Sequence, residues 1–136
     1  MTILAGAGLL LIRLVIGISF AAHGAQKLFG WFGGHGLKGT AGFFDSIGIK
    51  PGYTMALLAG LGELAGGLLF ALGLFTPIAG LLIAITMVVA IVKVHGPNGF
   101  WATQSGYEYN LMLAVVGIGI ALTGAGVFSI DAILFS

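Results

Sequence analysis

The sequence predicts an all-α membrane protein, a four-transmembrane-helix bundle with a short interfacial helix in its first loop. Of the 136 residues, 59 % are hydrophobic and 7 % are charged, and the mean hydropathy is +1.16. A soluble domain of this length cannot bury so much apolar surface. The apolar residues also form continuous runs without strict alternation, which favours helices over a transmembrane β-barrel.

Four apolar stretches are long enough to span a membrane, since a helix needs about 20 residues to cross ~30 Å of hydrocarbon. The predicted spans cover about 3–25, 53–75, 77–95 and 107–125. The first lacks the basic start of a signal peptide and has too long an apolar core, so we expect it to be retained. Together the spans predict one transmembrane domain, residues 1–136, with both termini on one side.

The loops between these spans carry their own signals. Residues 39–48 predict a short interfacial helix capped by Thr40 and ended by Gly48. In the turn before the third span, Pro77 stands where it can start a helix without breaking one. Aromatic residues of the two longer loops are expected to anchor at the membrane interface; they are Trp31, Phe32, Phe100 and Trp101.

Positive charge marks the two longer loops. Lys27, Lys38 and Lys50 lie in the first loop and Lys93 precedes the last, whereas the tight turn and both tails carry no Lys or Arg. By the positive-inside rule these loops face the cytoplasm and both termini face outside.

Polar residues within the spans fall on seams of small residues at alternating spacings of four and three. The seam through Arg13 is Gly6, Leu10, Arg13, Gly17, Phe20, Gly24 and Lys27, and the seam through Glu63 is Gly52, Ala56, Ala59, Glu63, Gly66, Phe70 and Gly73. This pattern predicts close helix packing around an inward-facing polar lining.

Arg13 and Glu63 each lie near the middle of a predicted span. The first two helices run antiparallel, so we expect the two side chains to meet at one depth and to form a buried ion pair. An unpaired charge at the bilayer midplane costs on the order of 3 kcal/mol or more, which favours such pairing.

A second polar cluster is predicted at the loop-side end of the bundle. Its members are His23, Lys27, Lys93, His95, Tyr107, Glu108, Tyr109 and Asn110. Titratable groups at the mouth of an apolar bundle suit binding of a quinone or phenol, or proton transfer. In the alternative interpretation the lysines snorkel to the interface and the tyrosines anchor there.

Several function classes are not supported. The chain has no cysteine, which excludes disulfides, thiolate metal sites and dithiol chemistry by the chain itself. No nucleotide-binding loop or hydrolase motif is present, the histidine spacing matches no metal site, and a net charge of +1 argues against nucleic-acid binding.

Five segments resemble the DoxX family. They are HGAQKLFG at 23–30, GTAGFF at 39–44, Glu63 with Gly66 and Gly67, NGFW at 98–101, and GYEYN at 106–110. The resemblance covers about residues 10–125. It implies a small four-helix bacterial or archaeal inner-membrane protein, with relatives that include the membrane subunit of a thiosulfate:quinone oxidoreductase and proteins linked to quinone or catechol stress.

The leading functional prediction is an integral membrane component of an oxidoreductase system that binds a quinone-like or phenolic small molecule. His23 or Glu108 would exchange protons, while Lys27 and Lys93 would hold a phenolate. The alternatives are a non-catalytic carrier or scaffold for lipid or hydrophobic solute and a structural partner of another subunit. Expected partners are membrane lipid, a quinone as the one candidate cofactor, a soluble or membrane redox subunit, and further copies of the chain. Whether the chain itself is an enzyme stays open.

Overall fold

The computed structural model describes residues 2–135 and is helical along most of that range. The four longest helices are α1 (Ile3–Phe29), α3 (Gly52–Leu72), α4 (Thr76–Ala90) and α5 (Glu108–Thr123). Two shorter helices are α2 (Gly36–Ser46) and α6 (Ile130–Phe135). Single helical turns are η1 (Trp31–Gly33), η2 (Ile91–His95), η3 (Gly96–Asn98) and η4 (Ala102–Gln104).

Three helical segments are long and apolar enough to cross a membrane, namely Ile3–Phe29, Gly52–Leu72 and Thr76–Asn98. The class predicted from composition, an all-helical membrane protein, is therefore confirmed. Helix α5 is also apolar but has 16 residues. At 1.5 Å per residue it extends about 24 Å, less than the ~30 Å hydrocarbon layer, so a fourth crossing stays a prediction.

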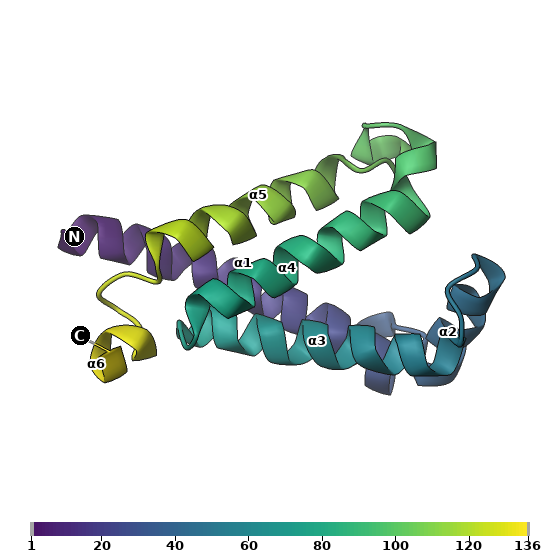
Figure 1. Ribbon diagram of the computed structural model, residues 1–136, viewed down its shortest axis with the longest axis horizontal. Helices are drawn as coiled ribbons and strands as arrows, with labels where there is room; N and C mark the ends of the chain where they lie inside the picture. Colours follow the sequence, from purple (N-terminus) through teal and green to yellow (C-terminus); the bar gives the residue numbers. More distant parts are fainter. Residues whose placement is uncertain (1, 136) are drawn as a thin grey trace.

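The long helices form two antiparallel pairs (Figure 1). Helix α1 packs on α3 and α4 packs on α5, and these are the two most extensive helix contacts. The pairs come together near the α3–α4 turn and diverge toward the opposite end, where α2 packs mainly on α3 (Figure 1). The start of α1 and the end of α6 lie at the same end of the molecule as the α3–α4 turn (Figure 1).

Glycine allows the close approach of α1 to α3. A Cβ added to Gly17 would lie 2.6 Å from the backbone nitrogen of Ala71, and one added to Gly24 would lie 2.5 Å from that of Leu64. Real carbon atoms do not approach nitrogen so closely without displacement, so these positions admit no larger residue unless the helices separate. Every residue of the two predicted seams through Arg13 and Glu63 is buried or half-buried, and the predicted inward faces are thereby confirmed.

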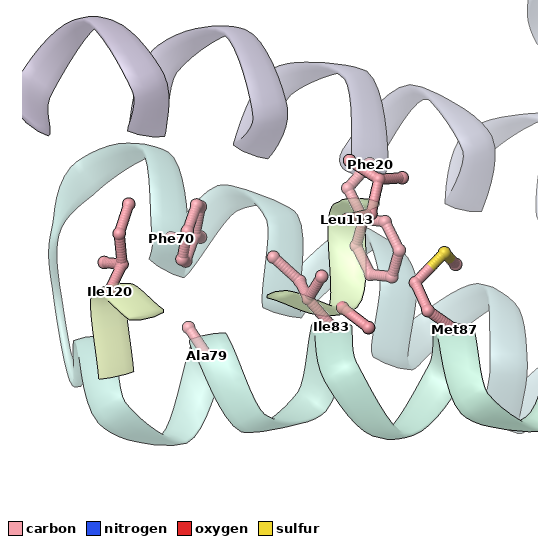
Figure 2. Packing of buried hydrophobic residues seen from close by; sticks show 8 residues of the cluster. Phe20, Phe70, Ala79, Ile83, Met87, Leu113 and Ile120 are labelled. Carbon is pink, nitrogen blue, oxygen red and sulfur yellow. The ribbon is translucent and has the colours of Figure 1, made fainter. Parts of the chain in front are cut away.

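The apolar core lies where the two helix pairs meet (Figure 2). Phe20 of α1 and Phe70 of α3 contact a row on α4 that includes Ile83 and Met87. Leu113 and Ile120 of α5 complete the cluster. Phe70 and Ile83 are fully buried, so this core fixes the relation between the pairs while their loop-side ends remain apart.

The outer faces of the helices are apolar as well. Exposed side chains include Leu11 and Val15 on α1, Leu58 and Leu61 on α3, and Ile118 on α5. A soluble monomer rarely exposes contiguous apolar surface on this scale. These outer faces are suited to contact with the hydrocarbon chains of a lipid bilayer.

Helix α2 begins earlier than the sequence predicted. It starts at Gly36 with His35 as its N-terminal cap, so Thr40 lies buried within the helix and is not its cap. Its last turn carries Asp45, whose Oδ1 accepts a hydrogen bond of 2.9 Å from the backbone nitrogen of Gly52. Asp45 thereby caps α3 and ties α2 to the start of that helix.

A polar cluster at the turn end fastens the C-terminal segment to the bundle. The guanidinium of Arg13 is fully buried and donates hydrogen bonds to the carbonyl oxygens of Ala125, at 3.2 Å, and Phe128, at 2.7 Å. Gly73 ends α3 at a φ of 68°, and the guanidinium occupies the space that a Cβ there would need. The sequence analysis did not foresee this docking.

Asp131 joins the C-terminal segment to the start of α4. Its carboxylate accepts hydrogen bonds from the backbone nitrogens of Phe75, at 2.7 Å, and Thr76, at 2.9 Å, and its own backbone nitrogen donates to the Gly73 carbonyl at 2.8 Å. Burial raises the pKa of Asp131, but the contacts with Thr76 and Phe75 and the charge of Arg13 outweigh it, so the pKa is lowered from the usual 3.8.

Candidate functional site

Glu63 forms an ion pair with Lys27, and the predicted pair with Arg13 is wrong. The Lys27 ammonium contacts Glu63 Oε1 at 2.8 Å and Oε2 at 2.7 Å. The error lies in the helix register, which places Arg13 against Gly73. Gly73 is ten residues, or about 15 Å of helix, beyond Glu63.

The ion pair is unevenly buried. The Glu63 side chain is 4 % exposed and that of Lys27 is 26 % exposed. Lys27 extends from the last turn of α1, whereas Glu63 lies in the interior of α3. The pair thus joins the two helices just inside the loop-side end and keeps one polar face open.

Glu63 differs in position from the other three acidic residues of the chain. Asp45 and Asp131 accept hydrogen bonds from the first backbone nitrogens of α3 and α4. Glu108 lies in the first turn of α5. Carboxylates at helix starts stabilise the unpaired N–H groups and the helix dipole. Glu63 has no such structural role, because it lies mid-helix, and it faces a cavity instead.

That cavity, the loop-side cavity, has a volume of about 420 Å³. Its polar lining includes His23, Lys27, Glu63, His95 and Asn110. Its apolar lining comes from residues such as Phe20, Met87 and Leu113, which also belong to the core (Figure 2). The cavity therefore has an apolar floor at the core and polar walls toward the loops.

His95 reaches the cavity from an irregular end of the third span. Residues Ile91–His95 form a π-helical turn, a feature that frequently occurs at functional sites. The Nδ1 of His95 lies 2.8 Å from the carbonyl oxygen of Ser105. Since a carbonyl only accepts, Nδ1 carries the hydrogen and donates it, which fixes the ring and leaves Nε2 as the acceptor in the neutral form.

The structure brings together part of the predicted loop-side cluster. His23, Lys27, His95 and Asn110 line the loop-side cavity, but Tyr107 and Glu108 do not line it. Tyr107 packs edge-on against Phe100 with 5.5 Å between ring centroids.

Tyr109 of the predicted cluster also lines this cavity, and so does Glu63, which was predicted to pair with Arg13. The buried side chain of Asn110 lies 3.6 Å from the sulfur of Met87. The predicted register of α1 against α3 was wrong by about ten residues. With the observed register, the prediction would have placed Glu63 in the loop-side cluster.

Lys93 borders a second and larger cavity, the lateral groove, of about 920 Å³. Apolar residues of α2, α3 and α4 form most of its wall, including Phe44, Met55, Leu58, Ile85 and Val89. Four residues line both cavities, namely Lys27, Glu63, Ala90 and His95. The ion pair therefore stands in the wall between the two spaces.

Within residues 2–135, no three His, Asp or Glu side chains are grouped so that they could hold a metal ion. The polar groups of the loop-side cavity instead include one lysine, two histidines, one tyrosine, one carboxylate and one amide. Such a set can orient a neutral or weakly acidic polar ring and exchange protons with it.

Fold and site together define a small helical membrane protein with a buried ion pair between two cavities. The chain belongs to the DoxX family, whose model matches residues 8–96; the resemblance found in the sequence is thus confirmed. No solved structure matches the chain.

Three relatives illustrate the family. The putative oxidoreductase CatD of Bacillus subtilis is 36 % identical over 94 % of this chain and 87 % of its own length. An uncharacterized membrane protein of Mycobacterium tuberculosis is 31 % identical over 88 % of this chain and 77 % of its own length. The inner membrane protein YphA of Escherichia coli is 29 % identical over 90 % of this chain and 87 % of its own length.

Proposed function

We propose that this DoxX-family protein is a membrane component of an oxidoreductase system that binds a quinone-like or phenolic ring in the loop-side cavity. The observation that carries the proposal is the Lys27–Glu63 pair at the wall of that cavity. A volume of about 420 Å³ lies in the range of small-molecule sites, roughly 300–1,000 Å³. The name of the CatD relative supports an oxidoreductase role.

The lining residues suit the polar atoms of such a ring. The Lys27 ammonium has a third N–H beyond the two directed at Glu63, and it can donate to a quinone carbonyl or stabilise a phenolate. The Asn110 amide can donate or accept at another ring oxygen. Phe20 and Leu113 offer apolar contact to the ring faces.

In this proposal, Glu63 and the histidines exchange protons with the bound ring. Reducing a quinone to a hydroquinone takes up two electrons and two protons. Glu63 and His95 lie at the cavity wall and can exchange the protons. The electrons come from a redox-active partner subunit, because the chain has no cysteine and the proposal assigns it no redox group.

The proposed location is the bacterial or archaeal inner membrane. Four lysines, Lys27, Lys38, Lys50 and Lys93, belong to the loop-side end, so this end faces the cytoplasm under the positive-inside rule. Helix α5 completes a fourth crossing with the segment after it, and α2 lies at the interface.

Mass spectrometry of small molecules extracted from the detergent-purified protein tests the proposal. We expect a co-purifying quinone or phenol in the wild type and its loss in Glu63→Gln. Lys38→Gln, which changes an exposed charge that lines neither cavity, is the matched control. Equal small-molecule content in all three proteins would contradict the proposed site.

A second candidate is a non-catalytic carrier or scaffold for lipid or hydrophobic solute, and the lateral groove is the observation that favours it. Uptake of a labelled hydrophobic solute into liposomes that contain the purified protein would support this function. Retention of a bound ring compound without uptake favours the oxidoreductase role.

A further inference from the structure

We infer that the lateral groove is a subsite for the hydrocarbon tail of the ligand, so that the ligand class is a long-tailed, membrane-resident amphiphile. This inference rests on the proposed function, since it places the polar ring in the loop-side cavity. It adds the lateral groove as a second subsite, entry of the ligand from the bilayer, and a hydrocarbon tail on the ligand.

The groove and the loop-side cavity meet at one wall. Of the four residues that line both, Lys27, Glu63 and His95 are polar and Ala90 presents only a methyl group. A ring held by the three polar groups can therefore extend a substituent past Ala90 into the groove.

The lining of the groove matches a hydrocarbon chain. Its walls come from Leu58 on α3, Ile85 and Val89 on α4, and Phe43 and Phe44 on α2. Two of these side chains are more than half exposed on the outer helix faces, Leu58 at 58 % and Ile85 at 60 %. The groove consequently opens between α3 and α4 toward the hydrocarbon of the bilayer, where tailed amphiphiles reside.

Its charge also fixes the orientation of the ligand. The polar lining of the groove is concentrated at the loop-side end, in Gln26, Lys27, His35, Lys93 and His95. The rest of the groove is lined mainly by apolar residues of α2, α3 and α4 and by Thr86, whose hydroxyl donates a hydrogen bond to the Leu82 carbonyl at 2.8 Å. A head group thus remains beside these charged and polar side chains while the tail lies against the apolar walls.

The main role of the groove is to give the tail a path out of the loop-side cavity while the ring stays bound. A tail already dissolved in hydrocarbon gains little transfer free energy from an apolar groove, because lipid chains are as apolar as its walls. A larger side chain in the groove should therefore collide with the tail and weaken binding of a tailed ligand. Binding of a ligand without a tail should be unchanged.

Two probes with one head group separate these effects. They are 2,3-dimethoxy-5-methyl-1,4-benzoquinone, which has no tail, and its 6-decyl derivative. Binding of each to the purified full-length protein is measured by titration calorimetry in one detergent, so micelle partition of each probe is the same for all variants. Thr86→Phe fills the groove, since Thr86 lines only that space. Val88→Phe adds the same ring to an exposed position of α4 outside both cavities and is the control.

We expect Thr86→Phe to weaken binding of the decyl probe about tenfold and to leave the tail-less probe unchanged, with Val88→Phe affecting neither. Unchanged decyl binding in Thr86→Phe, or equal weakening of both probes, would overturn the tail subsite. Loss of a co-purified phospholipid in Thr86→Phe with decyl binding unchanged would assign the groove to bilayer lipid and overturn it too. Failure of the wild type to bind either probe would instead contradict the proposed function.

Discussion

The ammonium of Lys27 contacts both carboxylate oxygens of Glu63, at 2.8 and 2.7 Å, and so joins the end of α1 to the interior of α3. The pair joins the two helices, and removal of either partner would leave the other charge unpaired. It also presents a charged donor and a carboxylate to the two adjoining cavities. Because the pair serves both stability and binding, a variant that removes both charges is needed to separate the two.

Removal of one partner should destabilise the bundle. Glu63→Gln or Lys27→Met leaves the other charge unpaired, and we expect each to cost about 3 kcal/mol, the lower end for buried pairs because Lys27 is partly exposed. The Lys27→Met/Glu63→Gln double variant should recover part of the loss. Melting temperatures in detergent provide the measurement, and strictly additive losses would show that the pair is not coupled.

Arg13 should hold the C-terminal segment and should not couple to Glu63. Arg13→Gln removes charged donors from the carbonyls of Ala125 and Phe128, hydrogen bonds worth about 1.5–3 kcal/mol each. We expect faster hydrogen exchange across residues 124–135, with the Lys27–Glu63 region unchanged. Coupling between Arg13→Gln and Glu63→Gln in a double-mutant cycle would restore the pairing that the structure rules out.

The attachment of α6 should weaken in acid. The pKa of Asp131 is lowered in the folded protein, so its stabilising effect is present above the unfolded value of about 4 and is lost as the pH falls through the lower folded value. Hydrogen exchange of the 124–135 segment at pH 6 and at progressively lower pH checks this. Asp131→Asn should show the weak attachment at every pH, and an acid response that persists in this variant would assign the effect to another group.

Two glycines of the first helix pair offer a matched test of helix approach. Gly24→Ala places a methyl group 2.5 Å from the backbone nitrogen of Leu64, and overpacking of this kind costs about 1–3 kcal/mol. Gly62→Ala in α3 meets nothing within 4 Å and should be neutral or slightly stabilising, because alanine favours helix. Similar melting temperatures for the two variants would contradict the observed α1–α3 register.

Reporter fusions test the membrane orientation. Because Lys27, Lys38, Lys50 and Lys93 belong to the loop-side end, a reporter in the 96–106 loop should report the cytoplasm and one at the C-terminus the outside. The reverse pattern would invert the proposed topology. Reporters on the same side would show that α5 and the segment after it do not cross the membrane.

The sequence predicted the inward faces of the helices well, because burial in a bundle follows helix periodicity. Gly17, Gly24 and Glu63 were all placed on the correct face. Periodicity contains no information about how far one helix slides along another, however. The pairing of Glu63 was wrong for that reason, because the observed register brings Lys27 opposite the carboxylate and Arg13 against Gly73.

Other features depended on contacts between distant segments. Asp131 and Arg13 act on the C-terminal segment through long-range hydrogen bonds that no local pattern announces. Likewise, Lys93 lines only the lateral groove, whereas His95, two residues later, lines both cavities. Only a three-dimensional structure could assign these residues to their sites.

Binding of the tail-less benzoquinone to the wild type and to the Lys27→Met/Glu63→Gln variant tests the central claim most directly. The double variant removes both charges without leaving either unpaired, so its fold can be verified by circular dichroism and its melting temperature. Titration calorimetry should show saturable binding to the wild type and to Lys38→Gln, and a loss of about tenfold or more in the double variant, since hydrogen bonds to charged groups contribute about 1.5–3 kcal/mol. Equal affinity in a folded double variant would contradict the assignment of Lys27 and Glu63 to a ring-binding site.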